Sequence, residues 1–351
     1  MKSEMPQAPR SEDHLIDPSD PAWDREILTT PGATIFHTSA WARVLTQTYG
    51  HTPLYHRIGK PGQPAVLFPL MEVSSPFSGR RGVSLPFTDF CAPLSIGPHG
   101  AELFGILQSL ASRRKWKHFE LRGEAELPGA EPSVSFHGHE LELSQNPERL
   151  FEFFRGSIRQ GIRKAERGGV TVEICDDGKS MADFYSLHQR TRRRHGVPPQ
   201  PWSFFAAIQR EIIAKNLGFI ATARLQGSPL ASAVYFHATD TAIYKFGASD
   251  YRHQELRPNN LVMWAAIRRL CELGCRSLHF GRTSLHNEGL RRYKLAWGAS
   301  ETMTRYFQFN TNDKSWDKSQ DHSSGLHNKL FDRLPLSMNR LAGALIYPHL
   351  D

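Results

Sequence analysis

The segment that most restricts the fold runs from Thr241 to Trp264 and reads as a strand, a polar loop and a helix. Thr241 to Phe246 carries strand-forming residues, and Gly247 is expected to end the strand. Pro258 then opens a helix with apolar positions at three-to-four spacing. The basic loop before this helix can bind an anion, because backbone N–H groups and the helix dipole point towards it. The alternative is an ordinary connection whose charges are solvated.

Both halves of the chain show the same order of predicted elements: a helix, hairpin strands, a helix, a strand, a short connection and a strand. This order predicts an α/β (α+β) fold with two similar units in tandem, each a mixed sheet flanked by helices. The expected parts are a flexible leader (1–20), a first unit (21–145), a second unit (146–312) and a tail with a C-terminal helix (313–351).

The expected elements follow from apolar periodicity and turn residues. Helices are predicted from His37 to Gly50, at Ala101–Arg114, Leu150–Arg167 and Ser180–His195, from Ser203 onward, and at Gly289–Trp297 and Leu326–Leu345. Strands are predicted at Pro53–Ile58, Ala65–Val73, Lys117–Leu121, Phe136–Leu143, Val170–Ile174, Phe219–Leu225, Leu230–Ala238, Thr241–Phe246, Arg276–Phe280 and Thr302–Phe309.

Charge and composition restrict the class of partner. The 351 residues carry a formal net charge of +8, which favours an anionic partner such as phosphate, nucleic acid or an acidic surface. No run approaches the roughly 18 apolar residues that span a bilayer. The N-terminal segment has no apolar signal region, so we expect a cytoplasmic protein, including one at the inner membrane surface. The four cysteines lack zinc spacing; we expect reduced thiols and no metal site.

Two predicted helices have faces that allow more than one interpretation. In Leu150–Arg167, the residues Arg155, Arg159, Arg163 and Arg167 form a stripe that is either a solvated basic face or a surface for phosphates. The amphipathic helix Leu326–Leu345 is expected to pack on the body of the protein. Its alternative role is to lie on a membrane.

The residues suited to chemistry favour acyl transfer without a covalent enzyme intermediate. The sequence has no nucleophile elbow, phosphate-binding Walker loop or HExxH motif. Direct transfer depends on positioning and charge stabilisation. Lys294 follows a predicted strand end and lies between Tyr293 and Trp297 in the sequence, where it can hold an oxyanion or phosphate. The alternative is a surface lysine whose stem covers apolar neighbours.

Four stretches together resemble the FemAB-like branch of the GNAT superfamily, which includes peptidoglycan interpeptide-bridge aminoacyltransferases. The resemblance covers roughly residues 22–312 and implies two GNAT-like domains with an active cleft between them, lined mostly by the second. The stretches are Ile35-Phe-His-Thr-Ser-Ala-Trp41, Ser84-Leu-Pro-Phe-Thr-Asp89, Ser157–Val170, and Tyr244-Lys-Phe-Gly-Ala248 running through Arg257-Pro-Asn-Asn260 to Tyr293-Lys-Leu-Ala-Trp-Gly-Ala299.

The resemblance also implies roles for individual residues. Family members pass an activated acyl group to an amine on a cell-wall precursor. Lys294 occupies the position of a lysine that supports developing charge, and Tyr244 matches a substrate-lining aromatic residue. Arg194 is the nearest match to an arginine that contacts precursor phosphate, with Arg192 and Arg193 as alternatives. Arg194, Tyr244 and Lys294 are expected to share one hollow. The other expected substrate-binding residues are Lys245, Arg257, Asn259, Asn260, Arg282, Tyr293 and Trp297.

Two departures from the family pattern leave the acyl donor open. Gly196–Gly218 has no room for the long helical arm of the tRNA-using bridge enzymes. Arg252–Asn260 contains no glycine, unlike the pyrophosphate loop of coenzyme A-binding relatives. The donor is therefore either aminoacyl-tRNA or acyl-CoA, with no permanently bound cofactor.

The resemblance and the basic residues together give the expected function. It is amide formation on an amine of an envelope glycan or lipid-linked precursor, so the partner is an anionic small molecule or such a precursor, with tRNA as one candidate. The alternatives are a coenzyme A-dependent N-acetyltransferase and a non-catalytic RNA- or phosphate-binding module.

Overall fold

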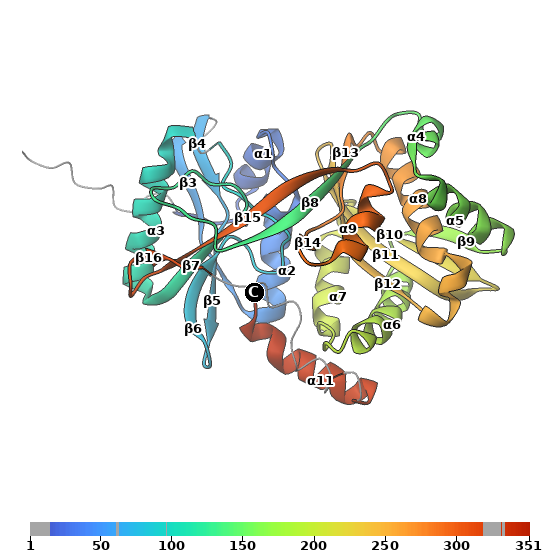
Figure 1. Cartoon of the computed structure of the whole chain (residues 1–351). Coiled ribbons are helices and arrows are strands. Elements are labelled where there is room, and N and C mark those ends of the chain that lie inside the picture. The colour runs from blue at the N-terminus through green and yellow to red at the C-terminus, as the bar shows by residue number, and fades with distance from the viewer. Residues whose placement is uncertain (1–14, 61–62, 96, 319–330, 332–333) are drawn as a thin grey trace, which may run out of the picture.

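The computed structural model describes residues 15–60, 63–95, 97–318, 331 and 334–351, and it shows helices packed against a long mixed sheet (Figure 1). The first half of the chain holds β1 (Leu15–Ile16), α1 (Pro21–Thr29), the short helix η1 (Ile35–His37), α2 (Ser39–Tyr49), β2 (Thr52–Pro53), β3 (Tyr55–Lys60), β4 (Gln63–Phe68), β5 (Met71–Ser75), β6 (Gly79–Val83), η2 (Gly97–His99), α3 (Gly100–Arg114), β7 (Trp116–Arg122) and β8 (Val134–Glu142).

The second half repeats the mixture of helices and strands, which confirms the predicted α/β (α+β) fold. It holds α4 (Pro147–Phe153), α5 (Gly156–Arg167), β9 (Thr171–Cys175), α6 (Gly178–Arg194), α7 (Trp202–Glu211), η3 (Ile213–Lys215), β10 (Gly218–Leu225), β11 (Ser228–Ala238), β12 (Thr241–Ser249), η4 (Tyr251–Leu256), α8 (Pro258–Glu272), β13 (Ser277–His279), β14 (Thr283–Ser284), α9 (Glu288–Leu295), β15 (Ser300–Asn310), β16 (Ser315–Trp316), α11 (Leu336–Ile346) and η5 (Tyr347–His349).

The main sheet joins the two halves. In the described residues it has 13 strands in the order β2-β5-β6-β7-β15-β8-β13-β12-β11-β10-β9, with β14 on β8 and β16 on β15. Strand β15 lies between β7 and β8, so Tyr306 pairs with Arg122 and Met303 with His137. Figure 1 shows β8 and β15 as the long strands that cross the middle of the molecule. The sheet therefore continues across the predicted domain boundary at residue 145, because β15 of the second half pairs with β7 and β8 of the first half.

A wedge opens in this sheet between β12 and β13. The two strands pair in parallel from Thr241 to Ile243, opposite Ser277 to His279. Strand β12 then continues to Ser249, whereas the segment after β13 turns away and forms β14 against β8. Among the described residues, the edge of β12 that faces β13 therefore has no ladder partner beyond Ile243.

The hydrophobic core also joins the halves. On one face of the sheet, Trp41 of α2 packs against Phe204 of α7 and Phe236 of β11, each with a centroid separation of 5.9 Å. On the other face, α5 and α8 pack together, with Phe154 and Trp264 among the buried residues. Both faces are apolar because the sheet is covered on both sides.

The predicted helix Leu150–Arg167 is in fact two helices. Phe154 and Arg155 have extended backbones and separate α4 from α5. The Phe154 ring is buried between Trp264 and Trp297, at centroid distances of 5.7 and 5.0 Å. The Arg155 backbone N–H donates to the Ala296 carbonyl oxygen at 3.0 Å. These contacts with distant parts of the chain favour the break, and sequence periodicity does not report them.

The prediction that Gly247 ends its strand is also wrong. Strand β12 runs through it, and the Tyr244 hydroxyl occupies the space beside it, 1.7 Å from where a Cβ would lie. This glycine therefore makes room for the phenol within the strand.

The structure describes only part of the expected leader and only part of the expected tail helix. Residues 1–14 of the expected leader lie outside the described residues, and Leu15 and Ile16 pair with β3. Residues 326–330, 332 and 333 of the expected tail helix also lie outside them, and α11 begins at Leu336, after Pro335. Within the described part of the chain, no helix is long and apolar enough to cross a membrane.

Helix α11 packs on the body of the protein. Gly343 sits against the Pro199 carbonyl, where a Cβ would lie 1.9 Å from the oxygen, and Asn339 is fully buried. The Tyr347 hydroxyl accepts a hydrogen bond from Arg192 of α6 at 2.7 Å and donates to the Pro198 carbonyl oxygen at 3.2 Å. Small and polar residues thus form the docked face of α11.

Candidate functional site

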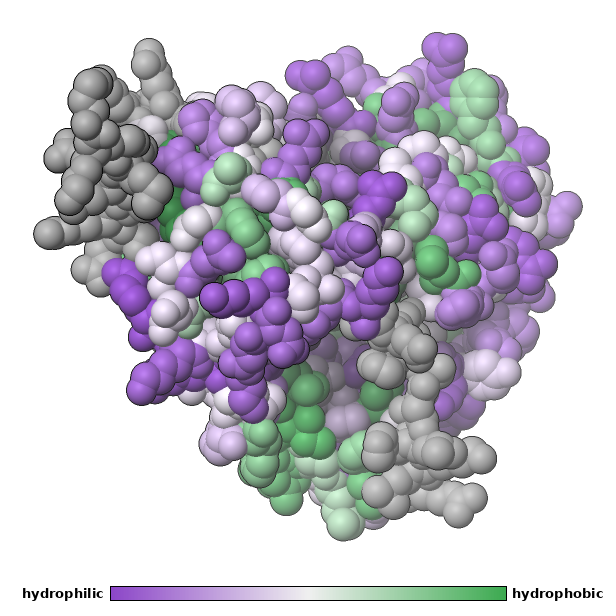
Figure 2. Space-filling view, turned by 60° about the vertical axis from the view of Figure 1, so that its left-hand side comes forward, coloured by the Kyte–Doolittle hydropathy of each residue, from purple (hydrophilic) through white to green (hydrophobic). Residues whose placement is uncertain are grey.

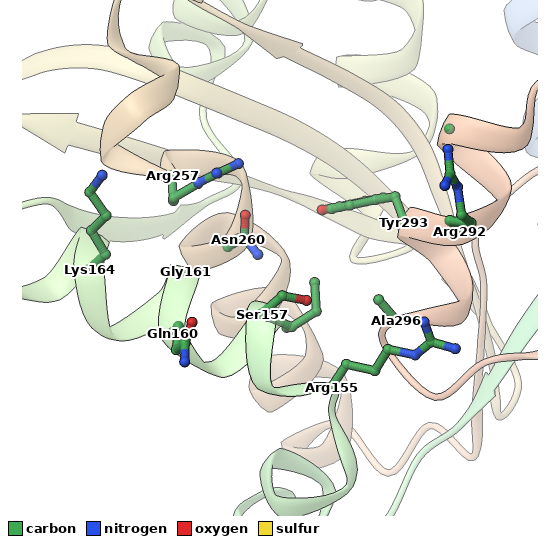
Figure 3. A pocket seen from close by; sticks show the side chains of 12 residues that line it. Arg155, Ser157, Gln160, Gly161, Lys164, Arg257, Asn260, Arg292, Tyr293 and Ala296 are labelled. Carbon is green, nitrogen blue, oxygen red and sulfur yellow. The ribbon is translucent and has the colours of Figure 1, made fainter.

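A cavity of about 590 Å³ lies between α5, the start of α8 and α9 (Figure 3). We call it the helix cavity. Its lining comes from three segments that are far apart in the sequence: Arg155, Ser157, Ile158, Gln160, Gly161 and Lys164; Arg257 and Asn260; and Gly289, Arg292, Tyr293 and Ala296.

The helix cavity is cationic. Arg155, Lys164, Arg257 and Arg292 line it, and no carboxylate is among the lining residues. Arg257 precedes Pro258 at the N-terminus of α8, where unpaired backbone N–H groups add positive potential. The arrangement suits a phosphate or pyrophosphate group.

The helices that form this cavity approach closely at Gly161 of α5. A Cβ at this position would lie 2.9 Å from Nδ2 of Asn260, which is itself buried on α8. Figure 3 shows the Asn260 side chain between α5 and the Arg257 loop. The missing side chain at Gly161 therefore lets α8 place its first turn against α5.

Tyr293 lines the helix cavity, and Tyr244 of β12 lies near it. Tyr293 points into the cavity from α9 (Figure 3). Burial raises the pKa of Tyr293 to about 12. Burial also raises the pKa of Tyr244, and the nearby Tyr293 raises it further. The Tyr244 ring packs beside Tyr235 of β11, with centroids 5.5 Å apart. Both phenols stay neutral near pH 7 and can donate hydrogen bonds.

A β-bulge at Lys245 changes the direction of the side chains on β12. Val234 of β11 pairs with Phe246 and Tyr235 pairs with Tyr244, so Lys245 is the extra residue. Its ammonium points towards the first half of the chain, 2.8 Å from Oδ2 of Asp89 and 5.1 Å from the Phe36 ring centre. Lys245, predicted to bind substrate, instead forms an ion pair between the two halves.

Electrostatics stabilise this ion pair in its charged form. Burial disfavours the Asp89 carboxylate, but the Lys245 ammonium and Arg282 hold the pKa of Asp89 well below its usual value. Burial lowers the pKa of Lys245, and Asp89 opposes that shift. The pair is therefore a structural link next to the wedge.

Lys294 is buried, and it is not among the residues lining the helix cavity. Its Nζ donates to the carbonyl oxygens of Gly281 at 2.7 Å and Arg282 at 3.2 Å. Burial lowers the pKa of Lys294 to about 8. Two of the three ammonium donors thus hold the loop between β13 and α9, and one is left.

The Arg282 side chain lies on the outside of this loop. Its guanidinium stacks 4.4 Å from the Phe136 ring centre and 5.2 Å from that of Tyr306. Its backbone N–H donates to Oδ1 of Asp89 at 3.3 Å. Arg282 is therefore close to the Lys245–Asp89 pair and absent from the lining of the helix cavity.

Three other predicted site residues lie away from the helix cavity. Arg194 is exposed at the end of α6, with its guanidinium 4.9 Å from the Tyr251 ring centre. Asn259 is exposed and donates to Ser249 Oγ at 3.4 Å. Trp297 is fully buried against Phe154. None of Arg194, Tyr244 and Lys294, which were expected to share one hollow, lines the helix cavity.

The structure brings together Arg257, Asn260 and Tyr293 from the predicted set. The prediction missed the other lining residues of α5 and α9. Ser157, Gln160, Gly161 and Lys164 follow helical spacing and form one face of α5, which is the signal that sequence reading overlooked. Of the predicted arginine stripe on this helix, only Arg155 lines the cavity.

The described residues hold no group of three histidine, cysteine, aspartate or glutamate side chains placed to bind a metal ion. Burial raises the pKa of the Cys91, Cys271 and Cys275 thiols, which keeps them protonated near neutral pH.

Residues 152–295 match the family model described as Acetyltransferase (GNAT) domain. The comparison with curated protein sequences gives no match. Among solved structures, FemX has a TM-score of 0.64 at 14% identity, covering 83% of this chain and 96% of FemX.

Two further solved structures share the fold. A tandem GNAT protein from the clavulanic acid biosynthesis pathway has a TM-score of 0.54 at 12% identity, covering 85% of this chain and 98% of its own. The C-terminal domain of a protein named as a lysylphosphatidylglycerol synthetase from Agrobacterium fabrum has a TM-score of 0.50 at 12% identity, covering 77% and 86%. Residues 152–295 therefore match a GNAT acetyltransferase domain, and the chain shares the fold of FemX and of the tandem GNAT protein.

Proposed function

We propose that this protein transfers an acyl or aminoacyl group to an amine on an envelope glycan or lipid-linked precursor, without a covalent enzyme intermediate. The single observation that carries the proposal is the helix cavity, whose four cationic side chains and helix N-terminus suit the phosphate groups of an activated donor. The names of two structural neighbours, FemX and a lysylphosphatidylglycerol synthetase, support the envelope and lipid classes of acceptor.

In the proposed reaction the acceptor amine attacks the acyl carbonyl carbon. A C–N bond forms, and the carbonyl oxygen becomes an oxyanion. The bond between the carbonyl carbon and the donor oxygen or sulfur then breaks, the donor leaves with that electron pair, and the amine loses a proton to solvent. No group on the protein is acylated, which agrees with cysteine thiols kept protonated by burial.

Within this proposal the donor anion binds in the helix cavity, and the acyl end passes Tyr293 towards the wedge between β12 and the Gly281 loop. The wedge offers backbone groups of β12 that have no ladder partner beyond Ile243. Lys294 has one N–H donor left after binding Gly281 and Arg282. We assign that donor to the oxyanion, since charge stabilisation at a buried site is stronger than in water.

The test is a donor and acceptor screen with the purified protein. Aminoacyl-tRNA and acetyl-CoA are each incubated with a lipid-linked amine acceptor, and amide products are measured by mass spectrometry. We expect an amide product and no acyl adduct in the intact mass of the protein. Anion binding without turnover of either donor would contradict the proposal and favour a binding module.

A coenzyme A-dependent N-acetyltransferase is the second candidate. The helix cavity lies at the strand–helix junction of the domain that matches the GNAT model, and a pyrophosphate fits the chemistry of its lining. Calorimetric titration with coenzyme A separates the candidates. Tight binding that is lost on replacing Arg257 favours this one, whereas the absence of binding favours an aminoacyl-tRNA donor.

A further inference from the structure

Helix α11 presents an apolar stripe to solvent. Met338, Leu341 and Leu345 follow helical spacing and are 55%, 62% and 64% exposed. The opposite side of the helix is the docked side, through Asn339 and Gly343. Figure 2 shows apolar side chains gathered at the bottom of the molecule, where α11 lies in Figure 1. A helix that docks through its small and polar residues and exposes its leucines has an apolar face with no packing partner among the described residues.

A second element extends this stripe. Phe77, at the tip of the hairpin between β5 and β6, is 84% exposed, and its ring packs edge-on against His349 with centroids 5.1 Å apart. Leu350 follows directly and is 43% exposed. The hairpin tip and the chain end thus continue the stripe. We call Phe77, Met338, Leu341, Leu345 and Leu350 the apolar face.

The contacts under the apolar face hold it rigidly on both halves of the chain. Arg192 of α6 binds the Tyr347 hydroxyl, and Arg81 of β6 binds the His349 carbonyl oxygen at 2.9 Å and the Asp351 carboxylate. Because these contacts come from opposite halves, the face is a fixed feature of the folded protein.

The charges around the apolar face are positive. Arg80 follows the hairpin tip, and the Lys117 side chain reaches Gly79 at the base of that hairpin, both exposed. The carboxylate of Asp351 is occupied by Arg81. An exposed apolar stripe with flanking cations fits an anionic lipid surface, where leucine and phenylalanine enter the interface and the cations meet lipid phosphates.

We infer that the apolar face docks this protein onto the surface of an anionic lipid bilayer. The helix lies in the interface without crossing it, with its docked side held by the protein. Such docking would bring a lipid-linked acceptor within reach. It is nevertheless independent of the proposed reaction, because vesicle binding is measured without donor or acceptor.

Flotation with phosphatidylglycerol vesicles and with phosphatidylcholine vesicles tests this inference. We expect the wild-type protein to float with the anionic vesicles, less at high salt, and not with the neutral ones. The variant Leu341→Ser/Leu345→Ser should bind the anionic vesicles about tenfold or more weakly, since it removes two inserting side chains. Arg80→Ser/Lys117→Ser should weaken binding and reduce its salt dependence.

Phe153→Ser is the matched control, since Phe153 is 71% exposed on α4 and lies outside the apolar face. It should bind vesicles like the wild type. Circular dichroism and the thermal midpoint show that each variant is folded. Equal vesicle binding by the wild type and the leucine variant would overturn the inference. So would a wild-type dimer in sedimentation that the leucine variant converts to a monomer, because the face would then be an interface between two copies.

Discussion

The Lys245 ammonium and the Asp89 carboxylate form an ion pair across the two halves of the chain, with Nζ and Oδ2 2.8 Å apart. The lysine is the extra residue of the bulge in β12, and the aspartate lies in the loop after β6. The pair borders the loop that Lys294 holds. The bulge therefore places Lys245 where it pairs with Asp89 of the first half, and Asp89 in turn contacts the loop beside the wedge.

Asp89→Asn should destabilise the folded protein by about 3 kcal/mol, because it leaves the Lys245 charge buried without its partner. The measurement is the free energy of unfolding in urea. Asp89→Asn/Lys245→Met should recover much of the loss, since it removes both charges. A single variant as stable as the wild type would show that the pair does not join the halves.

Lys294→Ala should lower the transfer rate roughly 10² or more if the lysine stabilises the oxyanion. Lys294→Arg, which keeps the charge, should retain more activity. Initial rates and the affinity for the donor are measured for both, with circular dichroism as the control for folding. Unchanged turnover in the alanine variant would remove Lys294 from the reaction.

The pH dependence of the rate follows from the lowered pKa of Lys294, about 8. The charged form disappears as the pH rises through that value, so the rate should fall above about pH 8. Stability runs the other way. Between the folded pKa and the ordinary lysine pKa of 10.5, the unfolded chain binds the additional proton, so the contribution of Lys294 to stability rises with pH. A rate that rises through pH 8, with the protein folded, contradicts the assignment; Lys294→Arg should shift the fall to higher pH.

Gly161→Ala should destabilise the protein by about 1–3 kcal/mol and weaken donor binding, because the new Cβ would meet Asn260 at 2.9 Å. Gly156→Ala in the same helix is the matched control, since nothing lies within 4 Å of its Cβ. That control should be neutral or slightly stabilising. Thermal unfolding compares the two. Equal behaviour would mean that α5 and α8 do not need their close approach.

Arg155→Ala should weaken the binding of inorganic pyrophosphate about tenfold, since one charge-assisted hydrogen bond contributes about 1.5 kcal/mol. Arg163→Ala removes an arginine from the same helix that does not line the helix cavity, and should leave binding unchanged. Isothermal titration calorimetry measures both. Equal losses in the two variants would point to the whole arginine stripe as the anion surface.

The sequence by itself determined the elements whose boundaries are local. Helix α2 begins after Thr38 and ends at Gly50 in a left-handed conformation, and α8 begins at Pro258, as their capping residues predict. The strand, loop and helix from Thr241 to Trp264 were predictable for the same reason, and Arg257 and Asn260 at the start of that helix line the helix cavity.

Only the tertiary structure decided which side chains meet. The break at Phe154 depends on Trp264 and Trp297, and Lys164 and Arg292 enter one cavity because α5 and α9 are brought together there. Trp297 and Lys294 are three residues apart, yet one fills the core and the other holds a loop. Short-range periodicity predicts whether a segment is a helix or a strand. It does not predict which residues that segment contacts, because those contacts come from distant segments.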